Sequence, residues 1–359
     1  MDKINNKFRG CLVGGAVGDV LGYAVEFMYE PEIFRKYGKN GITEYELKNG
    51  KAVFSDDTQM TLFTANGLIY GMTQQAIGRC DGDISDYIAR AYQDWYATQT
   101  ISTNIDKYIS WITDIPELHI RRSPGHTCLS AIASGKKGTL DKPINDSKGC
   151  GGIMRVAPIG LYYKDSPNEC AICAAEVSAI THGHELGYIP SALLSYLIYQ
   201  LTYCNTTIHK AAFELPILCD KIFGSAEHAQ MLNNLISKAV HLAETDKDTL
   251  TAIHELGEGW VAEETLAIAL YCALKYSDDF EKAVVTSVNH DGDSDSTGAV
   301  TGNILGAYLG LDAIPDKFKK DLEIYDRIIE LADDLYTSSQ NIGKKPDYDE
   351  KWINKYVNI

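Results

Sequence analysis

Two acidic clusters contain the residues whose types and spacing could carry chemistry. The first is Ser55-Asp56-Asp57-Thr58 and the second is Asp293-Ser294-Asp295-Ser296. Adjacent Asp side chains repel one another unless a cation lies between them, and hard divalent cations prefer oxygen ligands from carboxylates, hydroxyls and water. Neither cluster is accompanied by the Cys or His spacing of a zinc site. The two clusters therefore predict a magnesium site.

Two simpler explanations compete with metal binding. Ser55 or Asp56 would cap a helix through Leu62 to Tyr70, but a cap accounts for one acidic residue and not for two followed by a hydroxyl. When Asp291 is counted as position 1, the second cluster resembles an EF-hand loop, which needs Gly at position 6 and Glu at position 12. The sequence has Ser296 and Gly302 at those positions. An exposed, solvated acidic loop remains as the alternative for the second cluster.

Three further stretches have residues suited to binding a ligand. The glycine-rich run Gly149-Cys150-Gly151-Gly152 could offer backbone N–H groups to a phosphate, although it matches neither a Walker A loop nor a Rossmann fingerprint. His182 and His184 lack a third zinc ligand at a suitable spacing, so a ligand-contacting or structural histidine is the better interpretation. Trp260 follows a Gly-Glu-Gly loop and is either a stacking face for a ligand or a core or rim residue.

The elements that must position these residues are helices. Strand signals are scarce, whereas apolar residues recur at helical spacing in long segments separated by Gly- and Pro-containing loops. We expect helices over residues 62–69, 84–96, 170–180, 189–203 and 265–276. No stretch has the composition of a linker, so the sequence predicts one compact all-α domain over residues 1–359, ending in a C-terminal helix and tail over 318–359.

Two of these helices should meet at the centre of the domain. Glycines recur every four residues at Gly10, Gly14, Gly18 and Gly22, and again at Gly298, Gly302, Gly306 and Gly310. Each glycine costs a helix about 1 kcal/mol relative to alanine, but a stripe without side chains lets another backbone approach closely. We expect Asp19 and Glu26 on the first striped helix, and Asp293 and Asp295 just before the second. Carboxylates at a packed centre need a partner or a metal ion.

Composition narrows the functional class. A net charge of -16 and a pI near 5.0 repel nucleic-acid backbones, and no basic stripe compensates, so we expect no nucleic-acid partner. Nine scattered cysteines without framework spacing indicate reduced thiols, including the Cys170–Cys173 pair. The polar N-terminus and the absence of a long uncharged apolar run predict neither a signal peptide nor a membrane span. We expect a soluble, cytoplasmic protein.

Taken together and in this order, the motifs resemble the ADP-ribosylglycohydrolase family, which includes the ADP-ribosylarginine hydrolases and the dinitrogenase-reductase-activating glycohydrolases. The matching segments span residues 8 to 310 and are Gly10 to Asp19 with Glu26, Ser55 to Thr58, Arg122 to Gly125, Gly149 to Arg155, Thr181-His182 and Gly292 to Gly298. Residues 204–258 match none of these motifs, and contacts with a substrate protein are expected there.

The resemblance implies an orthogonal helical bundle with two Mg²⁺ ions at its centre. It places Ser55, Asp56, Asp57, Asp293, Asp295 and Ser296 at metal-ligand positions. It places Glu26 on a flexible loop whose acid reaches the metal site. Gly149, Cys150, Gly151 and Gly152 correspond to a loop for the phosphates of ADP-ribose, and His182 lies near the nucleotide.

The resemblance also implies a reaction, namely hydrolysis of the bond between ribose C1 and an arginine guanidine nitrogen, which releases ADP-ribose from a modified protein. Asp56, Asp57, Asp293 or Asp295 would accept the proton of the attacking water, through an oxocarbenium-like state. Glu26 would protonate the leaving group or gate access. Ser before the Asp pair and Gly-Cys-Gly in the loop are typical of the arginine-directed branch. The alternatives are hydrolysis of ADP-ribosyl-serine or another O-linked ADP-ribose, a catalytically silent ADP-ribose binder, and a magnesium-dependent nucleotide phosphohydrolase.

Overall fold

The computed structural model describes residues 2–100, 107–344 and 346–358. The single domain predicted over 1–359 therefore includes residue 1, residues 101–106, Lys345 and Ile359, which lie outside the described residues. Throughout the described ranges the chain forms helices and loops, with isolated bridges such as the one between Gly149 and Val261 in place of any β-strand. The all-α prediction is confirmed.

Each predicted helical segment overlaps an observed helix. The segments 84–96, 170–180, 189–203 and 265–276 agree with it to within four residues at each end, whereas the segment 62–69 covers only the middle of Asp56–Ala76. The α-helices are α1 (Lys3–Tyr23), α2 (Glu30–Tyr37), α3 (Asp56–Ala76), α4 (Ile84–Gln99), α5 (His126–Ala133), α6 (Ala157–Tyr162), α7 (Pro167–Ala179), α8 (Glu185–Tyr203), α9 (Ile208–Phe223), α10 (Ala229–Ala243), α11 (Thr249–His254), α12 (Ala262–Lys275), α13 (Phe280–Val288), α14 (Ser294–Leu309), α15 (Asp316–Lys320), α16 (Tyr325–Gln340) and α17 (Glu350–Tyr356). Short 3-10 helices are η1 (Trp111–Asp114), η2 (Pro116–His119), η3 (Cys150–Arg155) and η4 (Leu311–Ala313).

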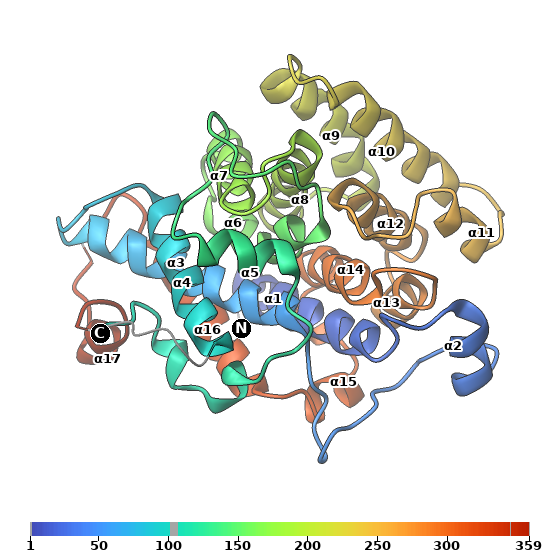
Figure 1. Cartoon of the computed structure of the whole chain (residues 1–359), viewed down its shortest axis with the longest axis horizontal. Coiled ribbons are helices and arrows are strands. Elements are labelled where there is room, and N and C mark those ends of the chain that lie inside the picture. Colours follow the sequence, from blue (N-terminus) through green and yellow to red (C-terminus); the bar gives the residue numbers. More distant parts are fainter. Residues whose placement is uncertain (1, 101–106, 345, 359) are drawn as a thin grey trace.

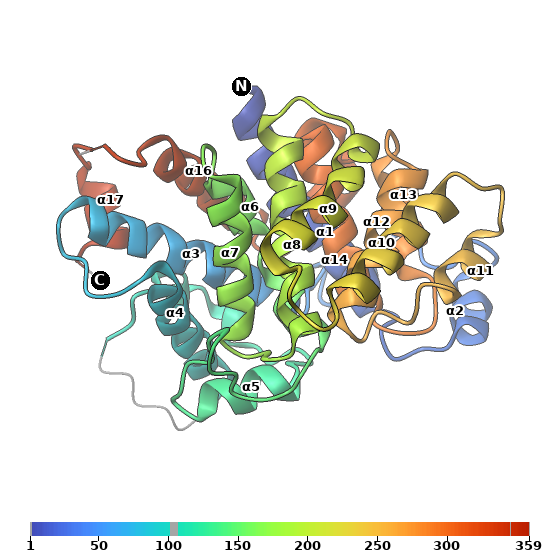
Figure 2. The same cartoon turned by 90° about the horizontal axis from the view of Figure 1, so that it is seen from above.

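The two glycine-striped segments form α1 and α14, which lie side by side at the centre of the molecule (Figures 1 and 2). They run antiparallel with their backbones in contact. A Cβ atom built on Gly18 would lie 1.9 Å from the Gly298 carbonyl oxygen, and one on Gly302 would lie 1.9 Å from the Gly14 oxygen. No side chain fits between the two helices at these positions. The stripes therefore mark a contact between two backbones, as predicted.

The bounds of these helices correct three expectations. Glu26 is not on α1, because the helix ends at Tyr23 and residues 24–27 form a turn in which Val25 N bonds to Gly22 O at 2.8 Å. Gly22 already packs on Ser294, the first residue of α14, so α1 has reached the end of its packing partner. Asp293 is the N-cap of α14 and Asp295 is within the helix rather than before it. Gly310, the last glycine of the second stripe, is the C-cap of α14 and not a residue within the helix, and its φ is 85°.

The remaining helices surround this pair. Helix α3 packs against α1, α4 and α16, while α8, α12 and α13 pack against α14. Helices α9, α10 and α11 form an outer layer beyond α8 and α12 (Figure 1), and they account for the stretch 204–258 that carries no recognisable motif. The predicted C-terminal helix over 318–359 is three separate helices, α15, α16 and α17. Cys170 and Cys173 are buried free thiols on α7, as expected. None of the helices in the described ranges has the length and apolar character needed to cross a membrane.

Replacing a stripe glycine should destabilise the whole fold. In Gly302→Ala the new Cβ would meet the Gly14 backbone oxygen. The gain of about 1 kcal/mol in helix propensity does not offset displacing one helix from the other, and we expect a net loss of about 1–3 kcal/mol or failure to fold. Gly125→Ala is the matched control, because its Cβ would meet nothing within 4 Å. Chemical denaturation measures both, and equal stabilities for the two variants would contradict the backbone contact.

Candidate active site

A cavity of about 230 Å³ opens where the N-termini of α3 and α14 meet the start of η3. Most of the predicted site residues line it, and they are Glu26, Asp56, Asp57, Gly149, Cys150, Gly151, His182, Trp260, Asp293, Asp295 and Ser296. Two predicted residues do not. Ser55 is fully buried at the N-cap of α3, and Gly152 packs against α7, where a Cβ would lie 2.1 Å from the Ser178 hydroxyl.

Asp19 fixes the first acidic cluster in place. Its side chain on α1 is fully buried and accepts hydrogen bonds from Ser55 N at 2.8 Å, Thr58 N at 2.9 Å and Thr58 Oγ1 at 2.5 Å. Ser55 Oγ accepts from Asp57 N at 3.2 Å, which confirms the predicted helix cap. The first turn of α3 is therefore held by one carboxylate from α1 and by its own serine cap, which leaves Asp56 and Asp57 facing the cavity.

The second cluster is joined to the first by a direct hydrogen bond. Ser296 Oγ donates to Asp57 Oδ2 at 2.8 Å, and Asp295 Oδ1 accepts from Ser296 N at 2.9 Å. Carboxylate oxygens of Glu26, Asp293 and Asp295 lie within 4.8 Å of one another. Segments from both ends of the chain thus place their acidic groups around one point.

These carboxylates are electrostatically unfavourable to one another. Burial, and after it the charge of Asp295, raises the pKa of Asp56, Asp57 and Asp293 well above the usual range of aspartate. Burial together with neighbouring Asp residues raises the pKa of Glu26 to about 10. The pKa of Asp19 rises to about 7 for the same reasons. Such a group of oxygens is stable as anions only with a compensating positive charge.

The residues present fit a hard divalent cation. Glu26 Oε2 is buried and makes no hydrogen bond within the described part of the chain, so it is free to act as a ligand. Carboxylate and hydroxyl oxygens dominate the acidic wall, which is the ligand chemistry of Mg²⁺ rather than Zn²⁺. Asp56, Asp57, Asp293, Asp295 and Ser296 would complete the ligand set.

A second wall of the cavity is formed by the glycine-rich loop and His182, and the Cys150 thiol of this loop lies against Asp293 and Ser296. Cys150 N donates to Trp260 O at 3.2 Å and Ala262 N donates to Lys148 O at 2.9 Å, so the loop is paired with the segment carrying Trp260. Cys150, Gly151 and Gly152 lie within the 3-10 helix η3, and Gly149 is its N-cap. Among the described residues that line the cavity, none is Lys or Arg. An anion on this wall would be held by neutral N–H donors.

Two aromatic side chains form part of the rim. Phe27, in the turn that carries Glu26, is 71% exposed and Trp260 is 40% exposed. Their rings stack with centroids 6.3 Å apart and planes 24° apart. Trp260 is thus a rim residue and not a core residue, and it lines the cavity.

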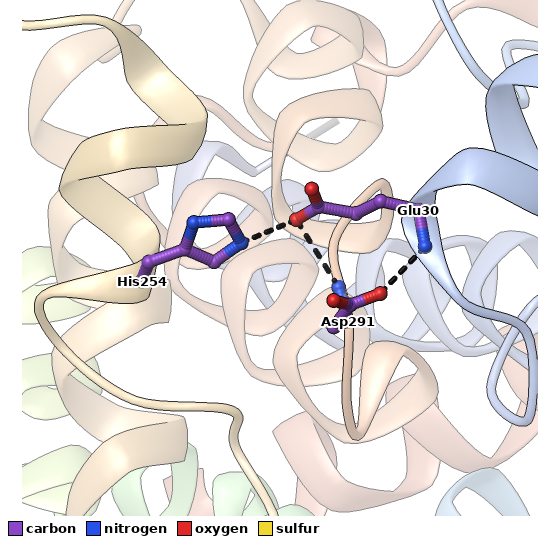
Figure 3. Close-up of side chains that lie close together, drawn as sticks. All are labelled: Glu30, His254 and Asp291. Carbon is purple, nitrogen blue, oxygen red and sulfur yellow. Dashed lines mark hydrogen bonds and ion pairs between the residues drawn. The ribbon is translucent and has the colours of Figure 1, made fainter.

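Glu30, His254 and Asp291, which we call the rim tie, join three segments that carry site residues (Figure 3). Glu30 Oε1 bonds to His254 Nε2 at 2.5 Å and accepts from Asp291 N at 3.4 Å, and Glu30 N donates to Asp291 Oδ1 at 2.5 Å. The tie therefore holds together the segments that carry Glu26, Trp260 and Asp293.

Several cavity residues were not predicted. Ser123, Gly125, His126, Thr127, Cys128 and Met154 line the cavity. Arg122 to Gly125 is one of the segments that match the family motifs, but no site residue is predicted in it. Ser123 in this segment has φ 52°, a value uncommon outside glycine. The start of α5 at His126 carries no signal in residue type or spacing that would have indicated a site.

The chain matches the sequence profile of the family described as ADP-ribosylglycohydrolase over residues 1–344. It is 24% identical to the ADP-ribosyl-[dinitrogen reductase] glycohydrolase of Rhodospirillum rubrum, covering 89% of this chain and 92% of that protein. It is 26% identical to the ADP-ribosylhydrolase ARH3 of Bos taurus, covering 92% of each. It is 23% identical to the ADP-ribosylarginine hydrolase Tri1 of Serratia proteamaculans, covering 92% of this chain and 79% of that one.

A solved structure titled as an ADP-ribosylglycohydrolase-related protein complex superimposes with a TM-score of 0.64 at 23% identity. The superposition covers 94% of this chain and 100% of that one. The likeness shows that the two chains share a fold.

Removing one carboxylate should change stability in opposite directions with and without cation. Without divalent ions, Asp57→Asn should be more stable than the wild type, because one buried like charge is gone while the contact with Ser296 can remain. Mg²⁺ at about 100 times its Kd should stabilise the wild type by about 2.7 kcal/mol and the variant far less. Thermal melts in EDTA and in Mg²⁺ measure this. Asp94→Asn, at a buried aspartate outside the cavity, is the control and should keep the wild-type Mg²⁺ response.

Breaking the rim tie should loosen the segment that carries Glu26. In Glu30→Ala or His254→Ala, we expect chymotrypsin to cleave at the exposed Phe27 and Tyr29 roughly fivefold faster, since an ion pair of this kind contributes up to about 1 kcal/mol. Glu281→Ala removes a comparable surface pair with Lys317 and should leave the cleavage rate unchanged. Equal acceleration in all three variants would show that the tie does not hold this segment.

Proposed function

The chain belongs to the ADP-ribosylglycohydrolase family, and we propose that it removes ADP-ribose from modified arginine side chains of proteins in a Mg²⁺-dependent reaction. The observation that supports this most strongly is the division of one cavity into two walls. One wall gathers buried carboxylates around Asp295, and the other presents a glycine loop and His182, with no Lys or Arg among the described lining residues. This combination suits a substrate that carries both a sugar with vicinal hydroxyls and a pyrophosphate.

Asp56, Asp57, Asp293, Asp295 and Ser296 would hold the Mg²⁺ ions, with Glu26 reaching them from the turn after α1. When bound, Mg²⁺ supplies Lewis-acid polarisation and a template for the ribose hydroxyls. The rigidity of this wall comes from the protein itself, because Asp19 and Ser55 fix the backbone of α3 and Ser296 links it to α14.

The pyrophosphate would lie along the glycine loop. Gly149 and Gly151 have no side chain, and a Cβ on either would lie close to the His182 ring, so glycine keeps this wall open. The cavity of about 230 Å³ is smaller than the roughly 300–1,000 Å³ typical of ligand pockets. The adenine would therefore extend to the rim, where Trp260 offers a stacking face.

For the chemical step, a carboxylate among Asp56, Asp57, Asp293 and Asp295 would accept a proton from the water that attacks ribose C1. The bond from C1 to the guanidine nitrogen breaks through an oxocarbenium-like state, which the same negative charges stabilise. Glu26, which carries the unpaired buried oxygen in this cavity, would protonate the departing nitrogen. The products are ADP-ribose and unmodified arginine.

Arginine is favoured over other acceptors by two observations. Ser55 before the Asp pair and Cys150 between the loop glycines are typical of the arginine-directed branch, and the Serratia relative is named for ADP-ribosylarginine. A silent ADP-ribose binder would be expected to lack an acidic ligand, and each predicted carboxylate is present on the cavity wall. Serine-linked ADP-ribose is the competing substrate.

The deciding assay presents ADP-ribosyl-arginine and ADP-ribosyl-serine peptides to the enzyme in Mg²⁺ and in EDTA, with release of ADP-ribose as the readout. We expect release from the arginine peptide in Mg²⁺ only. Asp293→Asn should reduce turnover at least about a hundredfold, because it removes a charge that stabilises the transition state, while Asp94→Asn keeps wild-type activity. Release from the serine peptide alone would show that the substrate is ADP-ribosyl-serine and not ADP-ribosyl-arginine. No release from either peptide would refute the proposed hydrolase activity.

A further inference from the structure

Arg155 is a buried cation that makes no ion pair. Its side chain is fully buried, and among the residues that the structure describes no carboxylate lies within ion-pair distance of it. One terminal nitrogen donates to Val177 O at 3.2 Å and to Thr181 Oγ1 at 2.7 Å, and the guanidinium carbon lies 4.3 Å from the centre of the Tyr92 ring. A charge in such a place is costly, so its contact with Thr181, directly before His182, calls for an explanation.

Donors and acceptors can be assigned in the hydrogen bonds that run from Arg155 through Thr181 to His182. A guanidinium donates and never accepts, so Thr181 Oγ1 must accept from Arg155. The hydroxyl has one proton of its own, and the acceptors beside it are His182 Nδ1 at 2.8 Å and the Cys128 thiol. If Nδ1 carried a proton instead, the buried hydroxyl proton would have only the thiol sulfur, a weak acceptor, to bond to. Thr181 therefore donates to Nδ1, and the proton of a neutral His182 ring lies on Nε2.

The opposite nitrogen of the ring faces the cavity. His182 lines the cavity, and its Nε2 atom lies 3.5 Å from where a Cβ on Gly149 would be and 3.3 Å from one on Gly151. No described residue forms a hydrogen bond with Nε2, whereas Nδ1 is occupied by Thr181. Nε2 is thus available to a ligand bound along the glycine loop.

We propose that Arg155 and Thr181 are positioning residues which fix His182 as a neutral ring protonated on Nε2, so that it donates a hydrogen bond to a phosphate oxygen of ADP-ribose. The proposal rests on the proposed function for the identity of the ligand, but the arrangement of protons does not. Burial and the Arg155 charge also lower the pKa of His182 to about 3, so the ring stays neutral at physiological pH.

The tautomer decides whether this wall attracts or repels an anion. A proton on Nε2 presents an N–H group to the phosphate, whereas a proton on Nδ1 would present a lone pair to it. Because none of the described lining residues is Lys or Arg, the lining offers no such side chain to offset that repulsion. Arg155 thereby contributes its charge through two hydrogen bonds, while the donor that meets the ligand is uncharged.

Nitrogen NMR of histidine tests the proton positions in the ligand-free wild-type protein. Selective ¹⁵N-histidine labelling, with His182→Gln to identify the signals, should show His182 as a single Nε2–H tautomer that does not titrate between pH 5 and 9. A ring protonated on Nδ1, or on both nitrogens in that range, overturns the proposal whatever the protein binds. This measurement does not depend on any variant of Arg155, whose replacement would test folding instead.

Calorimetry with ADP-ribose tests the consequence for binding. Thr181→Val keeps the shape of the side chain but removes the donor to Nδ1, so the Nε2–H signal should weaken and ADP-ribose should bind about ten- to a hundredfold more weakly. Thr181→Ser should restore both. Thr202→Val is the matched control, at a buried threonine outside the cavity whose hydroxyl makes no hydrogen bond among the described residues, and it should match the wild type. Wild-type affinity in Thr181→Val overturns the proposal, whereas failure of the wild type to bind ADP-ribose refutes the proposed function.

Discussion

Direct contact between the backbones of α1 and α14 is the constraint on which the rest of the structure depends. At Gly14, Gly18, Gly298 and Gly302 the two helices are so close that a single methyl group would force them apart. That closeness brings Asp19, on the buried side of α1, under the first turn of α3, and it brings Asp295 into the same region. The acidic wall of the cavity thus follows from the absence of side chains elsewhere on the same helices.

The two walls of the cavity differ in the charge of their side chains and in the charge of the ligand group that each would bind. The acidic wall concentrates carboxylates whose pKa values are raised by burial and by one another, so it is suited to a cation that comes from solution. The glycine-loop wall would face an anion, yet none of the described residues that line the cavity is Lys or Arg, and Arg155 reaches His182 only through Thr181. Keeping the fixed positive charge away from the carboxylates preserves the affinity of the acidic wall for metal, because a lysine or arginine in the cavity would pair with those carboxylates instead.

The sequence predicts the parts of this arrangement that depend on periodicity or on local hydrogen bonding. Glycine at every fourth residue is a property of one helix face, and Ser55 before two acids is a local cap, so both features could be predicted from the sequence. The structural role of Asp19 was not, because its partners include backbone N–H groups, which no residue type marks. The end of α1 before Glu26 depends on where its partner α14 begins, and the rim tie joins residues 30, 254 and 291, so neither could be inferred from nearby sequence.

The pairing of α1 with α14 also has a consequence for the order of folding during synthesis. Helix α1 ends at Tyr23, whereas its backbone partner is completed only at Leu309, so α1 is made long before α14. At about 5–20 residues per second, this delay is roughly 15 to 60 s. Throughout that interval the glycine face of α1 and the carboxylate of Asp19 lack their native neighbours. The acidic wall can therefore assemble only after the chain has been synthesised as far as α14.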